Sequence, residues 1–212
     1  MGGVKIFIQC RTGSSRLPIK ALFPFKGTTI IGYLVQQLKA HGFSNENLVL
    51  LIPENPENQV LRAYADKMKV HFFAGSEENL FERFQKGLGQ FACESVVRLT
   101  GDNPLLPPKW IDEYIALHEG GTQIMTTSRK WQNGKIVERK LPKGASIDIM
   151  RSSEILDVDT SKLSEAEREH VIPYFWRRFK DNIKMPDIDV DNRTFISIDT
   201  YADYLRLLKN YD

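Results

Sequence analysis

The chain has 212 residues, of which 42% are hydrophobic and 26% charged, proportions typical of a globular protein and not of a disordered or fibrous one. Its 29 basic and 27 acidic side chains give a formal net charge of +2, which argues against nucleic acid or an anionic membrane surface as a partner. Cys10 and Cys93 lie far apart, so a disulfide framework and a recognisable zinc motif are excluded. With no basic leader and no apolar run near the ~18 residues of a membrane span, we expect one cytoplasmic domain over residues 1–212.

In the first half of the chain, short apolar runs alternate with amphipathic stretches. Val4–Cys10 predicts a strand, and apolar residues at helical spacing from Ile30 to Leu38, before Gly42, predict a helix. Further strands are predicted at Leu48–Pro53, Val70–Phe73 and Ser95–Leu99, followed by helices with apolar faces of Val60, Leu61, Tyr64, Ala65 and Met68, of Leu80, Phe81, Phe84, Leu88 and Phe91, and of Trp110, Ile111, Tyr114 and Ile115. This alternation predicts an α/β fold with a mostly parallel sheet and helices on both faces.

The second half of the chain is less regular than the first. A hairpin is predicted at Asn133-Gly134, and the helical pattern of Ser164–Phe179 is expected to kink or split at Pro173. Strands are predicted at Gln123–Thr127, Ile147–Met150 and Phe195–Ile198, and a last helix at Tyr201–Leu208. The sheet is therefore expected to be parallel at its start and mixed at its end.

A cation-rich loop follows the first predicted strand, where ligands bind at the carboxyl edge of an open parallel sheet. The segment Arg11–Lys20 contains three cations, Arg11, Arg16 and Lys20, together with Gly13 and the hydroxyls of Thr12, Ser14 and Ser15. A glycine lets backbone N–H groups turn around an anion, and arginine and lysine bind phosphate oxygens. The alternative is a solvated basic loop, but its position favours a phosphate cradle.

Two aspartates follow other predicted strands and face the same edge. Asp102 comes directly after the strand Ser95–Leu99 and its Thr100-Gly101 turn, and Asp199 after the strand that ends at Ile198. Such carboxylates bind Mg²⁺ together with phosphates and water. Each could instead cap a turn or a helix, for Asp102 as an Asx turn and for Asp199 beside the N-cap candidate Thr200.

At these residues the chain resembles the cytidylyltransferase family of CMP-sugar synthetases, and most closely its branch of spore coat polysaccharide biosynthesis protein F. The loop Arg11–Lys20 matches the family's Arg-x-Gly-Ser-Ser/Thr-Arg-Leu-Pro-x-Lys pattern, although Cys10 stands where better-known relatives have alanine. Further matches, in the family's order, are Gly75-Ser76-Glu77-Glu78, Arg98-Leu99-Thr100-Gly101-Asp102-Asn103-Pro104, Gly144 to Asp148 with Asp in place of Glu, Arg168-Glu169-His170-Val171 and Asp199-Thr200.

The resemblance implies a Rossmann-like nucleotidyltransferase fold, as in nucleotide-diphospho-sugar transferases, and transfer of CMP from CTP to a sugar with release of pyrophosphate. The residues it implies for binding CTP are Arg11, Gly13, Ser14, Ser15, Arg16, Lys20, Arg98 and Thr100. Arg16, Lys20 and Asp102 would be catalytic, and Asp102 and Asp199 would bind Mg²⁺. Asp148, Glu169 and His170 are candidates for sugar binding, and the resemblance implies sugar binding or dimerisation for the less regular residues 129–190.

Two other classes of function compete with this hypothesis. A GT-A-type glycosyltransferase would use a nucleotide sugar on a related sheet, but Gly101-Asp102-Asn103 lacks the second aspartate of a DxD metal motif. A non-catalytic nucleotide-binding homologue would have no need of Arg11, Lys20, Asp102 and Asp199 together. A homodimer is also expected from the family resemblance and from the aromatic residues Trp131, Tyr174, Phe175 and Trp176.

Overall fold

The computed structural model describes residues 3–118, 123–125, 130–132, 135–138, 145–179, 182–184 and 196–211. These residues form a seven-stranded sheet with the order β11-β7-β10-β6-β1-β4-β5. Its strands are β1 (Val4–Gln9), β4 (Leu48–Pro53), β5 (His71–Gly75), β6 (Ser95–Thr100), β7 (Gln123–Met125), β10 (Asp148–Arg151) and β11 (Ile183–Lys184). Strand β10 runs antiparallel to β6 and β7, and the other pairs are parallel, which confirms the expected mostly parallel sheet.

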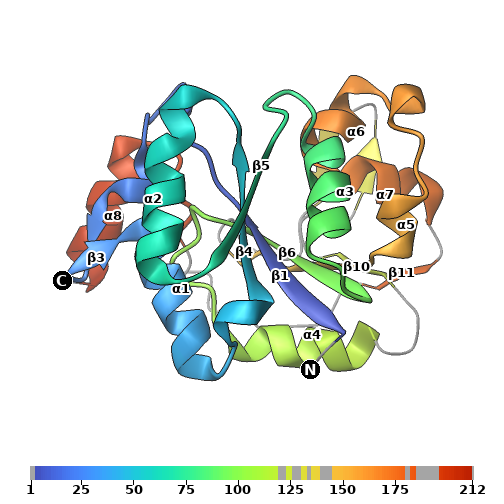
Figure 1. The fold of residues 1–212 in the computed structure, drawn as a ribbon. Helices are drawn as coiled ribbons and strands as arrows, with labels where there is room; N and C mark the ends of the chain where they lie inside the picture. The colour runs from blue at the N-terminus through green and yellow to red at the C-terminus, as the bar shows by residue number, and fades with distance from the viewer. Residues whose placement is uncertain are drawn as a thin grey trace.

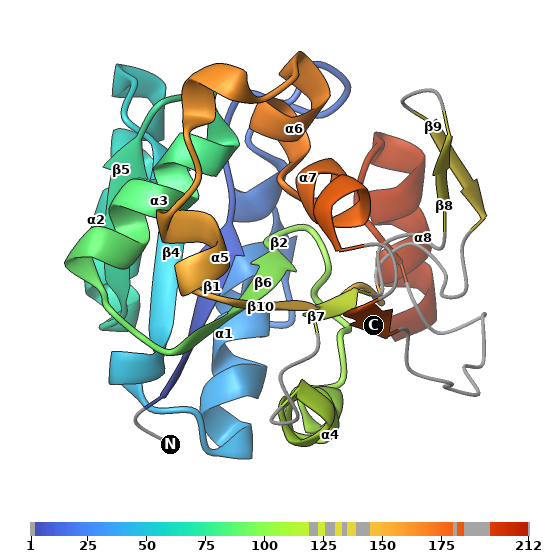
Figure 2. The ribbon, with the colours of Figure 1, turned by 90° about the vertical axis from the view of Figure 1, so that its right-hand side faces the viewer.

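Helices cover both faces of this sheet (Figures 1 and 2). One face carries α1 (Ile30–His41), α2 (Gln59–Met68) and α4 (Lys109–His118), and the other carries α3 (Leu80–Gln90), α5 (Ser153–Leu156), α6 (Glu165–His170) and α7 (Ile172–Arg178). Short 3₁₀ helices are η1 (Lys20–Leu22), η2 (Asn45–Asn47), η3 (Pro56–Asn58) and η4 (Thr160–Lys162). None of the helices in the described ranges is both long and apolar enough to cross a membrane.

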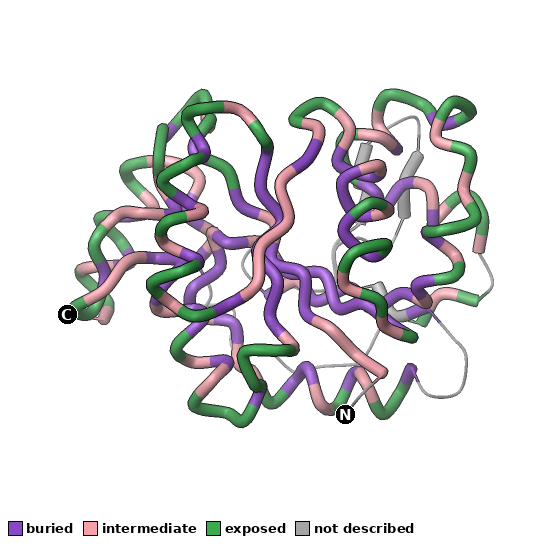
Figure 3. The backbone as a smooth tube through the Cα atoms, in the orientation of Figure 1, coloured by how far each residue is buried: buried purple, intermediate pink, exposed green. Residues whose placement is uncertain are grey.

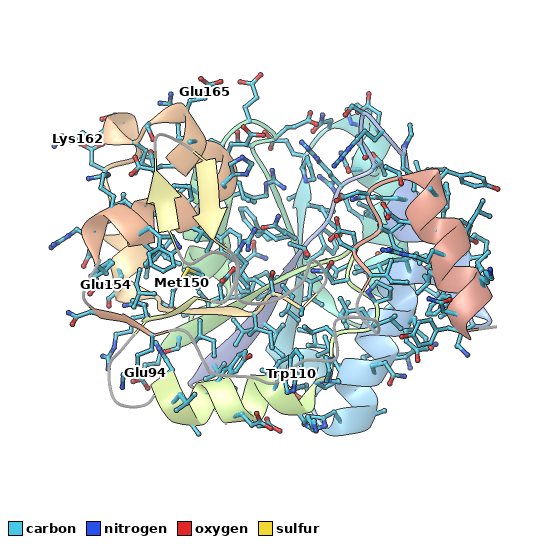
Figure 4. All side chains as sticks on the ribbon, turned by 180° about the vertical axis from the view of Figure 1, so that it is seen from behind. Glu94, Trp110, Met150, Glu154, Lys162 and Glu165 are labelled. Carbon is cyan, nitrogen blue, oxygen red and sulfur yellow. The ribbon has the colours of Figure 1, made fainter. Side chains whose placement is uncertain are left out.

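The alternation of side chains along the central strands divides the core into two layers. On β1, Ile6 and Ile8 pack against α1 and α4, whereas Phe7 packs against α3 on the opposite face. All six residues of β4 are buried, as expected for a strand covered on both sides (Figure 3). Met150 on β10 and Trp110 on α4, both labelled in Figure 4, belong to the core layers on opposite faces of the sheet.

A third apolar cluster holds the C-terminal helix α8 (Tyr201–Tyr211) beside α1 and the small β2 (Pro24–Phe25)–β3 (Thr28–Thr29) hairpin. The Tyr204 hydroxyl donates to the carbonyl oxygen of Pro24 at 2.7 Å. Leu17 and Ile198 are buried in the same cluster, so the cation-rich loop and the segment before α8 share one support.

The prediction of a strand at Phe195–Ile198 is wrong for its described part. Residues 196–199 have no regular secondary structure and lie outside the sheet, and Phe195 lies outside the described residues. The Ile198 amide donates to the carbonyl oxygen of Asp102 at 3.0 Å, so this segment pairs with the loop after β6. Its apolar residues Ile196 and Ile198 are buried against α8 and not between sheet neighbours.

Three other sequence expectations are refined by the structure. The helix pattern of Ser164–Phe179 does split, but at Val171, two residues before Pro173, which lies in the first turn of α7. Val60, expected on the apolar face of α2, is 46% exposed. Strands β8 (Lys130–Gln132) and β9 (Lys135–Glu138) pair antiparallel on either side of Asn133-Gly134, a turn that itself lies outside the described residues.

Candidate active site

A cavity of about 300 Å³ opens at the carboxyl ends of β1 and β6. It is lined by the loop after β1, the turn after β6, the segment from Glu77 to α3, the end of α6 and Asp199. The position agrees with the rule that ligands bind beyond the carboxyl ends of parallel strands. A second cavity of about 410 Å³ lies at the opposite ends of β1 and β6, next to α4, and contains none of the predicted site residues.

Lys20 joins the two predicted metal ligands. Its Nζ lies 2.6 Å from Oδ2 of Asp102 and 3.3 Å from Oδ1 of Asp199, and Arg16 approaches the same Asp199 oxygen at 3.3 Å. The side chains of Lys20, Asp102 and Asp199 are 15%, 21% and 19% exposed, so their charges are shielded but reachable. The ammonium group thereby lowers the repulsion between two carboxylates, and Arg16 supplies a second positive charge beside Asp199.

The loop that carries these cations is pinned at several points. Asn58 Oδ1 accepts hydrogen bonds from the backbone N–H of Thr12 at 2.9 Å and from its hydroxyl at 3.1 Å. The Ile19 amide closes the loop on the carbonyl oxygen of Thr12 at 2.8 Å, and the buried Leu17 anchors its middle. Lys20 is the first residue of η1, directly after this loop, so backbone contacts fix the position from which its side chain extends.

The other residues predicted in this loop lie near the cavity but are more open. Arg11, Ser14 and Ser15 line the cavity, and the Ser14 hydroxyl accepts from the Leu17 amide at 3.3 Å. Gly13 is exposed, and a Cβ built there would meet Oε1 of Glu77 at 3.5 Å. The loop therefore offers two guanidinium groups, one ammonium group and hydroxyls to a bound anion.

A backbone hydrogen bond to the loop after β6 holds the segment that carries Asp199 at the cavity. The Ile198 amide binds the Asp102 carbonyl, and the Asp199 amide donates to Oδ2 of Asp203 at 3.2 Å. The same Asp203 oxygen accepts from the Thr200 amide at 2.9 Å, as a capping carboxylate in the first turn of α8 does. The expected cap at Thr200 and the expected cavity residue Asp199 are thus compatible.

The turn between β6 and Asp102 requires a residue without a side chain. A Cβ at Gly101 would lie only 2.8 Å from the Cβ of Cys10, so glycine lets the ends of β1 and β6 meet beneath the cavity. Cys10 lies on the cavity floor, where burial raises the pKa of its thiol to about 12. The thiol stays protonated at neutral pH, which argues against a cysteine nucleophile.

Arg98 and Asp148, predicted to contact the nucleotide and the sugar, are placed differently from the loop residues. Arg98 is 7% exposed and Asp148 is completely buried, and Nη1 of Arg98 lies 2.7 Å from Oδ2 of Asp148. Neither belongs to the lining of the cavity, whereas Thr100, two residues beyond Arg98, does. In this structure they form a buried ion pair between β6 and β10, and their contact with a substrate stays a prediction.

Glu169 and His170 line the cavity from the end of α6. Both side chains are more than half exposed, and His170 Nε2 lies 3.8 Å from Oε2 of Glu169. The helix ends immediately after them at Val171, whose φ of 62° is strained for a β-branched residue. Because Val171 is fully buried, its packing holds the break that turns these two side chains toward the cavity.

The lining of the cavity also includes residues that were not predicted for the site, among them Gln9 and Arg83. Arg83 is 4% exposed on α3, and its guanidinium donates to the carbonyl oxygens of Ser76 at 2.8 Å and Glu77 at 3.1 Å. Burial, and next the nearby Arg11, lower its pKa to about 10, so it remains a cation at neutral pH. The available signal was a charged residue within the apolar face of a helix, and for Gln9 a polar residue at the end of an apolar strand.

The donor set suits a divalent cation held together with phosphates. Within the described ranges, no group of three or more His, Cys, Asp or Glu side chains is placed to hold a metal ion. Asp102 and Asp199 supply two carboxylates on either side of the Lys20 ammonium. Mg²⁺ usually takes one or two protein carboxylates and completes its shell with water and phosphate oxygens, so these two residues fit it when a nucleotide is bound.

Fold and site together define the class of the protein. A mostly parallel sheet with a cation-rich loop after its first strand and a carboxylate just beyond a neighbouring central strand has the layout of a nucleotide-binding α/β protein. The sequence model of the cytidylyltransferase family matches residues 6–203, and the chain belongs to this family. The resemblance found from the motifs is thereby confirmed.

Individual relatives agree with this assignment. A solved structure of a cytidylyltransferase from Leptospira borgpetersenii serovar Hardjo-bovis superposes with a TM-score of 0.81 at 30% identity, covering 96% of this chain and 84% of that one. The spore coat polysaccharide biosynthesis protein SpsF of Bacillus subtilis is 33% identical over 56% of this chain. The 3-deoxy-manno-octulosonate cytidylyltransferase of Anaeromyxobacter sp. (strain K) is 27% identical over 68% of it. The chain spans 50% and 58% of the lengths of these last two relatives.

Proposed function

We propose that the protein transfers CMP from CTP to a hydroxyl oxygen of a sugar, in the synthesis of a polysaccharide or another glycan, with release of pyrophosphate. The observation that carries this proposal is the ammonium of Lys20 between Asp102 and Asp199, at the end of a pinned cationic loop and inside the cavity. Family membership supports cytosine as the base. Gly101-Asp102-Asn103 lacks the second aspartate of a DxD motif, which argues against the glycosyltransferase alternative.

The reaction is an in-line displacement at the α-phosphorus of CTP. A bond forms from the sugar oxygen to the α-phosphorus, the bond to the β-phosphate bridging oxygen breaks, and the hydroxyl proton passes to solvent. Arg11, Arg16 and Lys20 would hold the phosphate oxygens and stabilise the charge on the departing pyrophosphate. No covalent intermediate on the protein is needed, since alignment and charge neutralisation lower the barrier.

Mg²⁺ is part of the proposal. Asp102 and Asp199 would hold the ion, which neutralises phosphate charge and polarises the α-phosphoryl group when bound. Lys20, which lies between the same two carboxylates, would contact phosphate oxygens of the nucleotide. Glu169 and His170 would contact the sugar from the side of α6.

The experiment is a pyrophosphate-release assay with CTP, Mg²⁺ and a panel of sugars. Sugar acids head the panel, because the Anaeromyxobacter relative is named for 3-deoxy-manno-octulosonate. We expect pyrophosphate with one class of sugar, more from CTP than from UTP, ATP or GTP, and none after EDTA treatment. Release of a nucleoside diphosphate from a nucleotide sugar instead would support the glycosyltransferase alternative and contradict the proposal.

We also propose a cytoplasmic homodimer. Phe175 on α7 is fully buried in the core, and Tyr174 and Trp176 are partly buried against the same core layer. Their burial explains these three aromatic residues without an interface. The side chain of Trp131 lies outside the described residues. The dimer therefore rests on the family resemblance. Light scattering should give about twice the 24.4 kDa chain mass at micromolar concentrations, and a monomer mass throughout that range would contradict it.

A further inference from the structure

Three neighbouring strands place Gln9, Arg98 and Asp148 side by side on the face of the sheet that α3 and α6 cover. Asp148 of β10 is directly opposite Arg98 of β6, and Gln9 ends β1 on the other side of β6. The Arg98 guanidinium uses Nη1 to bind Asp148 at 2.7 Å and Nε to bind Oε1 of Gln9 at 2.8 Å. The row therefore runs from a fully buried carboxylate to a residue that lines the cavity.

The row fixes which end of the Gln9 amide faces the substrate. A guanidinium has only N–H donors, so the group in contact with Arg98 must be the amide oxygen. The opposite orientation would set the amide NH₂ against an N–H, which gives no hydrogen bond. Nε2 is therefore left with two N–H donors, and none of the residues that the structure describes accepts a hydrogen bond from it.

A buried ion pair is a weak way to gain stability, because desolvation offsets much of its attraction, and an apolar pair of similar volume often serves as well. A buried ion pair can, however, fix the orientation of a neighbouring polar side chain. Asp148 binds Arg98, and Arg98 binds the side-chain amide of Gln9. Gln9 is paired with Thr100 in the register of β1 and β6, and both residues line the cavity together with Asp102.

We infer that Gln9 binds substrate by donating a hydrogen bond from Nε2 to a substrate oxygen at the floor of the cavity, and that Arg98 and Asp148 are positioning residues for it. This inference rests on the proposed function. The oxygen belongs either to the α-phosphate of the nucleotide or to the sugar, and both offer the same acceptor chemistry. The neutral amide adds orientation where the surrounding arginines and Lys20 add charge.

Two variants test the inference. Gln9→Glu keeps an oxygen for Arg98 but replaces the NH₂ with a carboxylate oxygen, so a residue that only supports Arg98 would retain function. Gln9→Met removes the donor without adding charge. We expect both variants to lower kcat/KM by about three- to tenfold, the usual effect of one neutral hydrogen bond. Thermal unfolding of Gln9→Glu should match the wild type, because the contact with Arg98 persists.

Binding of CTP alone, measured by calorimetry, separates the two sources of the oxygen. Weaker CTP binding in both variants assigns it to the nucleotide, and unchanged CTP binding with a raised KM for the sugar assigns it to the acceptor. Wild-type kinetics in Gln9→Glu would overturn the inference. So would loss in Gln9→Glu alone that disappears at 0.5 M salt, since that pattern reports charge repulsion only. A wild-type protein that releases no pyrophosphate would contradict the proposed function instead.

Discussion

Among single residues, Lys20 has the central place in the site, because it contacts two carboxylates at the edge of the sheet. Asp102 and Asp199 reach this edge from positions far apart in the chain, and each lies within 3.3 Å of the same Nζ atom. An ammonium group in that place lowers the repulsion between the carboxylates and is also a suitable partner for phosphate oxygens. The same residue thereby links the stability of the fold to substrate binding.

Replacing Lys20 with methionine should make Asp102 and Asp199 bind a divalent cation more tightly in the absence of nucleotide. The two carboxylates lose their shared counter-ion, and a divalent ion can then lower their repulsion. We expect Mg²⁺ or Mn²⁺ without nucleotide to raise the melting temperature of Lys20→Met more than that of the wild type, while CTP binds more weakly. Equal shifts in the two proteins would show that Lys20 does not compete with metal at this site.

Asp102→Asn and Asp199→Asn keep the shape of the side chains and remove their charge. We expect each to lower turnover by at least a hundredfold, since metal and phosphate alignment depend on the carboxylate, with a much smaller change in unfolding free energy. The exposed Asp66→Asn on α2 is the matched control and should leave turnover unchanged. Turnover of either site variant within a few-fold of wild type would contradict a role in metal binding.

At the scale of elements, the break between α6 and α7 is held by a small polar network. Ser164 and Glu167 form a capping box at the start of α6, and Oε1 of Glu167 accepts from Nε of Arg177 on α7 at 2.5 Å. Val171 between the helices accepts a strained backbone because it is buried and because Pro173 favours a new first turn. The network therefore supports the orientation of the α6 end that lines the cavity.

Glu167→Gln should destabilise the protein in a pH-dependent way. Burial tends to raise the pKa of Glu167, but the hydrogen bonds from Arg177 and Ser164 outweigh it and hold the pKa below its ordinary value near 4.5. A depressed folded-state pKa means that the ionised group contributes stability above the unfolded pKa and loses it as the pH falls through the folded pKa. We expect a loss of about 1–2 kcal/mol at pH 7 that shrinks below about pH 4.5.

Glu165→Gln on the same helix provides the control for this experiment. Glu165 is exposed and points away from the fold in Figure 4, so the substitution should change stability little at any pH. Chemical unfolding of the two variants between pH 3.5 and pH 8 measures the effect. A pH-independent difference between them would contradict an ionised Glu167 as the source of the stability.

The two halves of the chain differ in how far their elements could be predicted. Strands β1, β4 and β6 are short apolar runs in βαβ units, and hydrophobic periodicity identifies them directly. Ile196 and Ile198 carry the same local signal, yet they bury against α8 while the backbone pairs with the loop after β6, a tertiary outcome that period-2 patterning cannot reveal. Likewise, Pro173 predicts a break in the helix but does not fix it at Val171.

The candidate site consists of segments that are far apart in the chain and that the order of strands in the sheet brings together. The cationic loop and Asp102 were predictable, because the carboxyl ends of parallel strands meet at one edge. The buried pairing of Arg98 with Asp148 was not, since it depends on β10 lying antiparallel beside β6. Gln9 and Arg83 carry local signals, a polar residue at a strand end and a charge within an apolar helix face, but only the fold shows that both residues line the cavity.

Because the site draws on distant parts of the chain, a bound nucleotide should stabilise the whole fold. The loop after β1, the turn after β6 and the segment before α8 all border the cavity, so a ligand that contacts them opposes global unfolding. At about 100 times its dissociation constant, a ligand adds ~2.7 kcal/mol, which for a chain of this size raises the melting temperature by about 5–10 °C. We expect CTP with Mg²⁺ to give the largest shift in a panel with UTP, ATP and GTP. Arg16→Ala should reduce that shift. It should not lower the melting temperature of the ligand-free protein, because the Arg16 side chain is 61% exposed. An equal shift for all four triphosphates would show that the cavity binds phosphates without selecting the base.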